Sequence, residues 1–184
     1  MTEIRPLTRF TLDELHRVAS GYFSGQKYDV AHTETDDEIT FSLSLIDLEQ
    51  PYVKKYSFDQ ESLETYTSLL ANGLCFGVYD NGDLAGLAIS EVHEWNNSVQ
   101  IHDFHIAEPS RGRGLGRQLM ERVVSAARDA GLRIVVCETQ NKNVPAIKFY
   151  KSLGFSLAGI DLTHYRNTSY PDGEIAVFMK LQLT

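Results

Sequence analysis

The fold of this chain is decided by the stretch Arg111-Gly112-Arg113-Gly114-Leu115-Gly116, which lies between an apolar strand pattern and a long helical pattern. Three glycines at alternate positions let the backbone curl so that successive N–H groups point inward. The helix that follows adds its unpaired N-terminal donors and the positive end of its dipole. With Arg117, three arginines place cations around the same loop. The stretch therefore predicts a cradle for a diphosphate.

The stretch does not match two other kinds of phosphate-binding loop, because each requires residues that are absent here. A dinucleotide-binding loop needs G-x-G-x-x-G, and Arg117 stands where the third glycine belongs. A P-loop needs Gly-Lys followed by Ser or Thr, which this stretch lacks. The remaining match is R/Q-x-x-G-x-G/A, with Arg111, Gly114 and Gly116 at its fixed positions. This pattern resembles the pyrophosphate loop of the GNAT acetyltransferases, which bind acetyl-CoA. The alternative is a glycine-rich strand-to-helix turn with incidental arginines.

A second signature, N-x-x-A-x-x-F-Y-x-x-x-G-F, follows after one helix and one strand. Its fixed positions are Asn143, Ala146, Phe149, Tyr150, Gly154 and Phe155. Ala146, Phe149, Tyr150 and Leu153 fall at helical spacing, which predicts that they form one face of a helix that ends at Gly154. An amphipathic helix with an aromatic core stripe would explain Phe149 alone. Because both motifs occur in order, the chain is identified as a member of the GNAT superfamily.

Length and composition are those of one globular domain, expected to span 1–184. Of the 184 residues, 42% are hydrophobic and 23% charged. No apolar run approaches the roughly 20 residues that span a bilayer, and the first residues lack a signal pattern, so a cytoplasmic location is expected. Cys75 and Cys137 lie in apolar runs and are expected to be buried free thiols.

The net charge of −8 argues against a nucleic-acid partner. An acidic molecule attracts cations, so the expected partner is a small-molecule amine, with no membrane partner and with a homodimer left open. Four histidines, His16, His32, His93 and His164, show no grouping with Cys or acidic residues at metal-ligand spacing, and no metal is expected.

Hairpins in the first half and a strand–helix–strand order in the second predict a mixed α/β (α+β) sheet with helices on both faces, as in the GNAT fold. Strands are expected at 4–7, 39–47, 75–79, 84–94, 99–106, 134–139, 157–163 and 174–181, and helices at 11–22, 59–70, 115–130 and 144–153. The strand at 39–47 alternates and is expected to be half-buried. The polar stretch Ser24–Asp37 is expected to be irregular and mobile, and 80–83 to form a hairpin turn.

The resemblance also implies which residues hold the cofactor. The strand before the loop runs beside pantetheine in the family, which places Phe104, His105 and Ile106 there through their backbone groups. The remaining cofactor-binding residues implied are Arg111, Gly112, Arg113, Gly114, Leu115, Gly116, Arg117, Asn143, Ala146 and Tyr150.

Acetyl transfer to an amine needs a neutral nucleophile, a stabilised thioester oxygen and a proton for the departing thiolate. Tyr150 matches the family tyrosine that serves as general acid. Three residues are candidates for the base: His102, Asp103 and Glu138. Side chains alternate along a strand, so His102 and Asp103 share a face only if a β-bulge intervenes. For each of the three, a satisfied polar residue at a strand edge is the alternative.

Over most of its length the chain is similar to the streptothricin acetyltransferase branch, in Pro51–Tyr56, Ile101–Asp103, Glu138–Asn141 and the tail from Tyr165 to Phe178. Relatives in that branch carry Glu-Asp where this chain has His102-Asp103. The expected activity is acetyl transfer from acetyl-CoA to a primary amine of a small cationic acceptor, such as a streptothricin-type antibiotic. The alternatives are a protein or peptide N-acetyltransferase and a non-catalytic CoA-sensing module.

Overall fold

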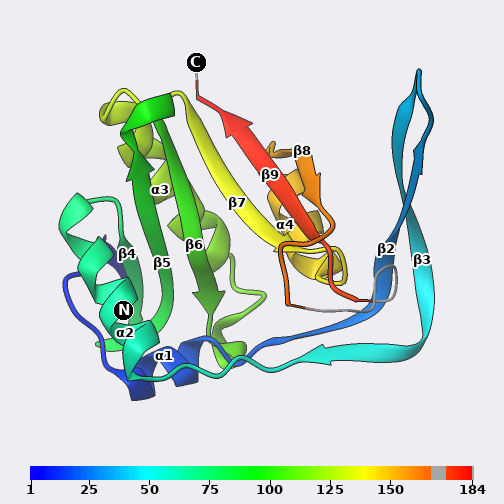
Figure 1. Cartoon of the computed structure of the whole chain (residues 1–184). Coiled ribbons are helices and arrows are strands. Elements are labelled where there is room, and N and C mark those ends of the chain that lie inside the picture. The colour runs from blue at the N-terminus through cyan, green and yellow to red at the C-terminus, as the bar shows by residue number, and fades with distance from the viewer. Residues whose placement is uncertain (167–172, 184) are drawn as a thin grey trace. The chain divides into compact units, whose positions relative to one another are not determined.

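The computed structural model of this chain describes residues 1–166 and 173–183, which form two compact units (Figure 1). The first unit comprises Met1–Gly21, Lys55–Cys137 and Leu181–Thr184, and the second comprises Tyr22–Lys54 and Glu138–Lys180. A single domain spanning 1–184 stays a prediction. The predicted features that fall on 167–172, including part of the tail from Tyr165 to Phe178, lie outside the described residues.

The first unit is built on strands that lie in the order β1-β4-β5-β6-β7. These are β1 (Thr2–Pro6), β4 (Phe76–Asp80), β5 (Asp83–His93), β6 (Ser98–Ile106) and the start of β7 (Ile134–Gln140). Neighbours are antiparallel except β6 and β7, which are parallel over Ser98–Ile101 and Ile134–Cys137. The expected hairpin turn joins β4 to β5, because Asn81 and Gly82 take the positive φ angles of 52° and 94° that a tight turn requires.

Helices cover both faces of these strands, as the sequence predicted. On one face, α1 (Leu12–Val18) and α2 (Gln60–Leu69) pack over a cluster that includes Leu87 and Ile89. On the other face lies α3 (Leu115–Asp129), whose Arg122 guanidinium sits 4.5 Å from the ring of Phe76. The short helices η1 (Leu70–Asn72), η2 (Glu94–Asn96) and η3 (Glu108–Ser110) complete the unit.

Both helix starts at the N-terminal end follow their sequence signals, but α1 is shorter than expected. Thr11 and Glu14 form the full capping box of α1, and Asp59 caps α2. The helix predicted over 11–22 ends at Val18, because Gly21 turns the chain with φ 98° and Tyr22 begins a strand.

The second unit contains a long hairpin of β2 (Tyr22–Glu34) and β3 (Ile39–Lys54), drawn in blue and cyan in Figure 1. The prediction of an irregular stretch at Ser24–Asp37 is therefore wrong over most of its length. Its polar composition hid the strand, whose backbone groups pair with a partner beyond the turn at 35–38. The strand predicted at 39–47 is present and runs on to Lys54, but its expected half-burial is wrong, since Ile39 and Phe41 are 61% and 43% exposed.

The rest of the second unit consists of α4 (Val144–Ser152) and the antiparallel pair β8 (Ser156–Asp161) and β9 (Ala176–Gln182). Helix α4 ends as predicted, since Leu153 is its C-cap residue and Gly154, directly after it, takes a φ of 90°. Cys75 and Cys137 are buried free thiols, which confirms that prediction. In the described part of the chain, no helix is long and apolar enough to cross a membrane.

We predict that α3 contributes most to stability through its buried face. The side chain of Leu119 is fully buried, and Leu119→Ala should lower the free energy of unfolding by about 2–5 kcal/mol. The matched control is Glu121→Ala on the same helix, whose side chain is 60% exposed and whose loss should cost within about 0.5 kcal/mol. Urea unfolding measures both; equal losses would contradict this description of α3.

Candidate functional site

The turn from β6 into α3 has the backbone conformation that the glycines predicted. Gly112 and Gly114 take φ angles of 73° and 79°, which residues with a side chain rarely adopt. A Cβ at Gly112 would meet nothing within 4 Å, so glycine is needed there for its positive φ and not for close packing. Gly116, the third glycine, lies inside the first turn of α3. No side chain caps α3 at Gly114, and the first N–H groups of a helix with such a start are the donors that bind anions in proteins.

The arginines of this loop all have protein partners. Arg111 Nε donates to the carbonyl of Ile106 at 2.9 Å, and its Nη2 donates to the carbonyl of Gly21 at 2.9 Å. Arg113 Nη1 lies 2.7 Å from Asp80 Oδ2, which holds the pKa of that carboxyl below its ordinary value. Arg117 lies 3.7 Å from Glu121. Arg111 therefore braces the loop, and direct contacts from these cations to phosphate stay a prediction.

Within the first unit, the C-terminal half of β6 pairs with β5 alone. Phe104, His105 and Ile106 lie opposite Ala88, Leu87 and Gly86, whereas the pairing of β6 with β7 stops at Ile101. A Cβ at Gly86 would lie 2.4 Å from the Ile106 side chain and 2.9 Å from the His105 carbonyl oxygen. Sequence reasoning missed Gly86, which allows the two strands to approach closely at this point.

The β-bulge on which the sequence argument depended is present. Ile101 lies opposite Ser90 and Asp103 opposite Ile89, so His102 is an extra residue without an opposite number. His102 Nε2 lies 2.8 Å from Glu91 Oε2, which lowers the pKa of that carboxyl. Ile89 and Glu91 are two residues apart and share a face of β5. His102 and Asp103 therefore lie on that same face.

Asp103 belongs to a half-buried polar network on this face. His105 Nε2 lies 2.7 Å from Asp103 Oδ1, and both side chains are 12% exposed. Tyr66 of α2 also hydrogen-bonds Asp103, and burial together with the negative charge of Asp103 raises the pKa of Tyr66. The ring of Tyr56 meets the His105 ring edge-on at 5.1 Å. The side chain of His105, which sequence reasoning had assigned only through its backbone, is thus the partner of a candidate base.

The third candidate base, Glu138, lies in the second unit on β7. Its side chain is 18% exposed, and burial raises the pKa of its carboxyl above the ordinary value. Tyr165 donates a hydrogen bond to Glu138 Oε1, and His164 Nε2 lies 3.9 Å from Oε2. Both of these neighbours act in the opposite direction on the Glu138 pKa, whereas the charge of Glu174 adds to the rise.

A second carboxylate of this unit, Glu174, holds the base of the long hairpin. It accepts hydrogen bonds from Lys54 Nζ at 2.8 Å and from the Tyr52 hydroxyl at 2.8 Å. Burial and the neighbouring carboxylate raise the pKa of Tyr52 to about 12. These pairs join residues more than a hundred positions apart, so no local pattern could have predicted them.

The signature residues of α4 have structural partners within the second unit. Asn143 caps the helix by accepting a hydrogen bond from the backbone N–H of Ala146 at 3.2 Å. The buried face consists of Val144, Ile147 and Tyr150, whereas Ala146 and Phe149 are only half-buried. Of the predicted face of Ala146, Phe149, Tyr150 and Leu153, only Tyr150 is fully buried and the other three are half-buried, because the fully buried side chains follow in steps of three from Val144.

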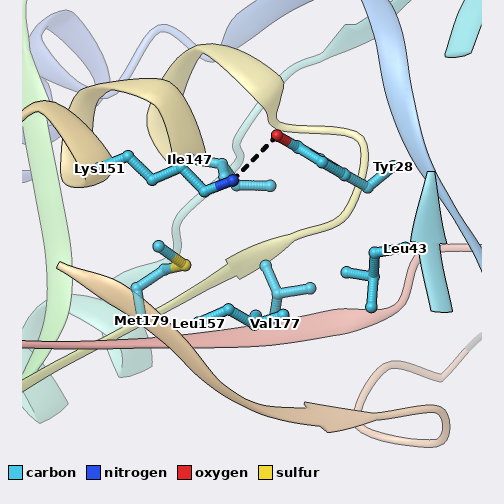
Figure 2. A pocket seen from close by; sticks show the side chains of 7 residues that line it. All are labelled: Tyr28, Leu43, Ile147, Lys151, Leu157, Val177 and Met179. Carbon is cyan, nitrogen blue, oxygen red and sulfur yellow. Dashed lines mark hydrogen bonds between the residues drawn. The ribbon is translucent and has the colours of Figure 1, made fainter. Parts of the chain in front are cut away.

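Figure 2 shows a pocket of about 170 Å³ in the second unit, with one cation at its rim. Its lining residues are Tyr28, Leu43, Ile147, Lys151, Leu157, Val177 and Met179. Lys151 Nζ donates a hydrogen bond to the Tyr28 hydroxyl at 3.1 Å across the opening. Sequence reasoning assigned none of these residues to a site. Among the described residues, no group of three or more His, Cys, Asp or Glu side chains could hold a metal ion.

A helix that starts without a side-chain cap after two glycines with positive φ can bind a phosphate group through its first N–H groups. The chain belongs to the acetyltransferase (GNAT) family, whose model matches residues 41–155. Members of this family use acetyl-CoA as co-substrate.

Two curated relatives and one solved structure show which members of the family this chain is similar to. The streptothricin acetyltransferase of Streptomyces lavendulae is 38% identical over 101 residues, which cover 55% of this chain and 53% of that protein. The streptothricin acetyltransferase of Escherichia coli is 31% identical over 128 residues, covering 70% of this chain and 69% of that one. The crystal structure of nourseothricin acetyltransferase superposes with a TM-score of 0.78 at 27% identity, covering 100% of this chain and 99% of the other. The chain thus spans about half the length of the first of these relatives.

Proposed function

We propose that this chain transfers the acetyl group of acetyl-CoA to a primary amine of a small cationic molecule, with a streptothricin-type antibiotic as the first candidate acceptor. The observation that carries the proposal is the left-handed glycine loop at the uncapped start of α3, in a chain of the GNAT family. The names of the two relatives in Streptomyces lavendulae and Escherichia coli support the choice of acceptor. The net charge of −8 favours a cationic one.

In the proposed reaction the first N–H groups of α3 and the loop hold the diphosphate of CoA. The backbone of Phe104, His105 and Ile106 pairs with pantetheine as a neighbouring strand would. The neutral amine nitrogen forms a bond to the thioester carbon, and the carbon–sulfur bond breaks. The thiolate takes a proton from Tyr150, and the nitrogen loses a proton to the base.

Glu138 is the base that we propose. Its carboxyl is partly exposed, and its raised pKa makes it a better proton acceptor than an ordinary glutamate. His102 and Asp103 are the runners-up, because the first is paired with Glu91 and the second is shared between His105 and Tyr66. A carboxyl is mostly ionised only above its pKa, so activity that depends on Glu138 as base should rise with pH through that pKa.

Gly114→Asp tests the coenzyme loop. The substitution keeps a residue that tolerates positive φ but adds a negative charge where phosphate would lie, so CoA affinity should fall more than about 100-fold. Gly114→Asn, with the same shape and no charge, is the matched control and should lose much less. Calorimetry measures CoA binding, and urea unfolding should show both variants folded. Equal affinities in the two variants would contradict the loop assignment.

Tyr150→Phe tests the general acid. The affinity for acetyl-CoA should stay nearly unchanged, whereas kcat should fall by roughly 10²–10⁴-fold, the range for a lost proton donor. Tyr28→Phe removes another phenol of the same unit and should keep kcat within about threefold. If Tyr150→Phe also keeps kcat within that range, another donor protonates the thiolate.

An amine panel tests the acceptor class. Polyamines and β-lysine-containing amines should turn over faster than amino acids with a free carboxylate, because the acidic protein attracts cations. Their KM should rise with ionic strength, which screens that attraction. Faster turnover of anionic acceptors would refute the electrostatic argument. Binding of acetyl-CoA with neither hydrolysis nor transfer to any amine would favour a CoA-sensing module.

A further inference from the structure

One hydroxyl group joins two side chains of β7 in the second unit. Glu138 and Gln140 are two residues apart and therefore lie on the same face of the strand. Gln140 Nε2 donates to the hydroxyl oxygen of Tyr165 at 2.8 Å, and that hydroxyl donates to Glu138 Oε1. The three groups form a chain with a single direction from the amide to the carboxylate.

The direction of this chain follows from counting protons. A phenol has one proton, and an ionised carboxylate can only accept it, so the Tyr165 proton lies toward Glu138. The lone pairs of the same oxygen then face Gln140, which fixes its NH₂ group toward Tyr165. Gln140 is 9% exposed, and among the described residues its Oε1 has no hydrogen-bond partner. The hydrogen bond from Nε2 to Tyr165 therefore orients this amide, because its Oε1 makes no hydrogen bond to any described residue.

We propose that Tyr165 is a positioning residue for the reaction: it occupies Glu138 Oε1 and, held in turn by Gln140, leaves Glu138 Oε2 as the oxygen that receives the amine. This inference rests on the proposed function, because it assigns the acceptor amine to Glu138. The Glu138 side chain is 18% exposed, and His164 Nε2 lies 3.9 Å from Oε2, which is beyond hydrogen-bond distance. A primary ammonium group, with three donors around one nitrogen, fits a single open carboxylate oxygen.

The titration of Glu138 separates this role from a merely structural one. Among the described residues, the titratable groups that bear on its carboxyl are Tyr165, His164 and Glu174. The hydrogen bond from Tyr165 favours the ionised form and lowers the Glu138 pKa against the effect of burial. Removing that donor raises the pKa further, so the carboxylate becomes available only at higher pH.

The test compares pH profiles of kcat/KM in the full chain. In Tyr165→Phe the acidic limb should move to higher pH, and kcat/KM should fall more at acidic than at alkaline pH. The matched control is Tyr52→Phe, which removes a hydroxyl that donates to another carboxylate of the same unit, Glu174. This control should leave the acidic limb close to its wild-type position. An unshifted limb in Tyr165→Phe would overturn the proposal.

Two further measurements keep the outcomes distinguishable. Glu138→Gln should remove the acidic limb; if the limb persists, the base assignment itself is wrong. If the limb disappears in Glu138→Gln but Tyr165→Phe shifts nothing, only the positioning role fails. Should Tyr165→Phe reduce stability, a direct NMR titration of the Glu138 carboxyl below the unfolding temperature gives the same comparison, and an unchanged Glu138 pKa would refute the inference.

Discussion

The first unit depends on one turn that reverses the chain between β6 and α3. Two glycines with positive φ make this turn, and the guanidinium of Arg111 secures it by donating to the carbonyls of Ile106 and Gly21. Because an arginine presents its donors in a rigid fork, the end of a strand and the end of the first chain segment are held by one side chain. Helix α3 starts directly after this turn, and β7, which lies parallel to the first half of β6, follows that helix in the chain.

Local patterns in the sequence predicted much of this unit. The glycine loop, the hairpin turn at Asn81 and Gly82 and the capping box at Thr11 each act over a few residues, and each is present in the structure. The hairpin of β2 and β3 was missed because much of β2 is polar, and hydrophobic periodicity gives no sign of such a strand. Contacts such as Tyr165 with Glu138 need the folded chain before they exist.

The candidate bases also show which properties follow from local sequence and which need the folded chain. The sequence placed three titratable residues on strands near the motifs but could not rank them, because their hydrogen-bond partners come from elsewhere in the chain. In the structure, His102 is held by Glu91 of the neighbouring strand, and Asp103 by Tyr66 of a helix. Glu138 is distinguished by a carboxyl pKa that burial raises above the ordinary value. Partners and burial, more than residue type, separate these carboxylates and imidazoles.

The bulge at His102 shifts the alternation of side chains along β6 by one residue. Before it, Val99 and Ile101 point their buried side chains to one face of β6; after it, odd-numbered residues point to the other, where Asp103 meets α2. If His102 were instead paired opposite Ile89, strict alternation would place the carboxylate of Asp103 and the imidazole of His105 on the face on which Ile101 is packed. A single inserted residue thus lets one strand be apolar core at its beginning and carry polar chemistry at its end.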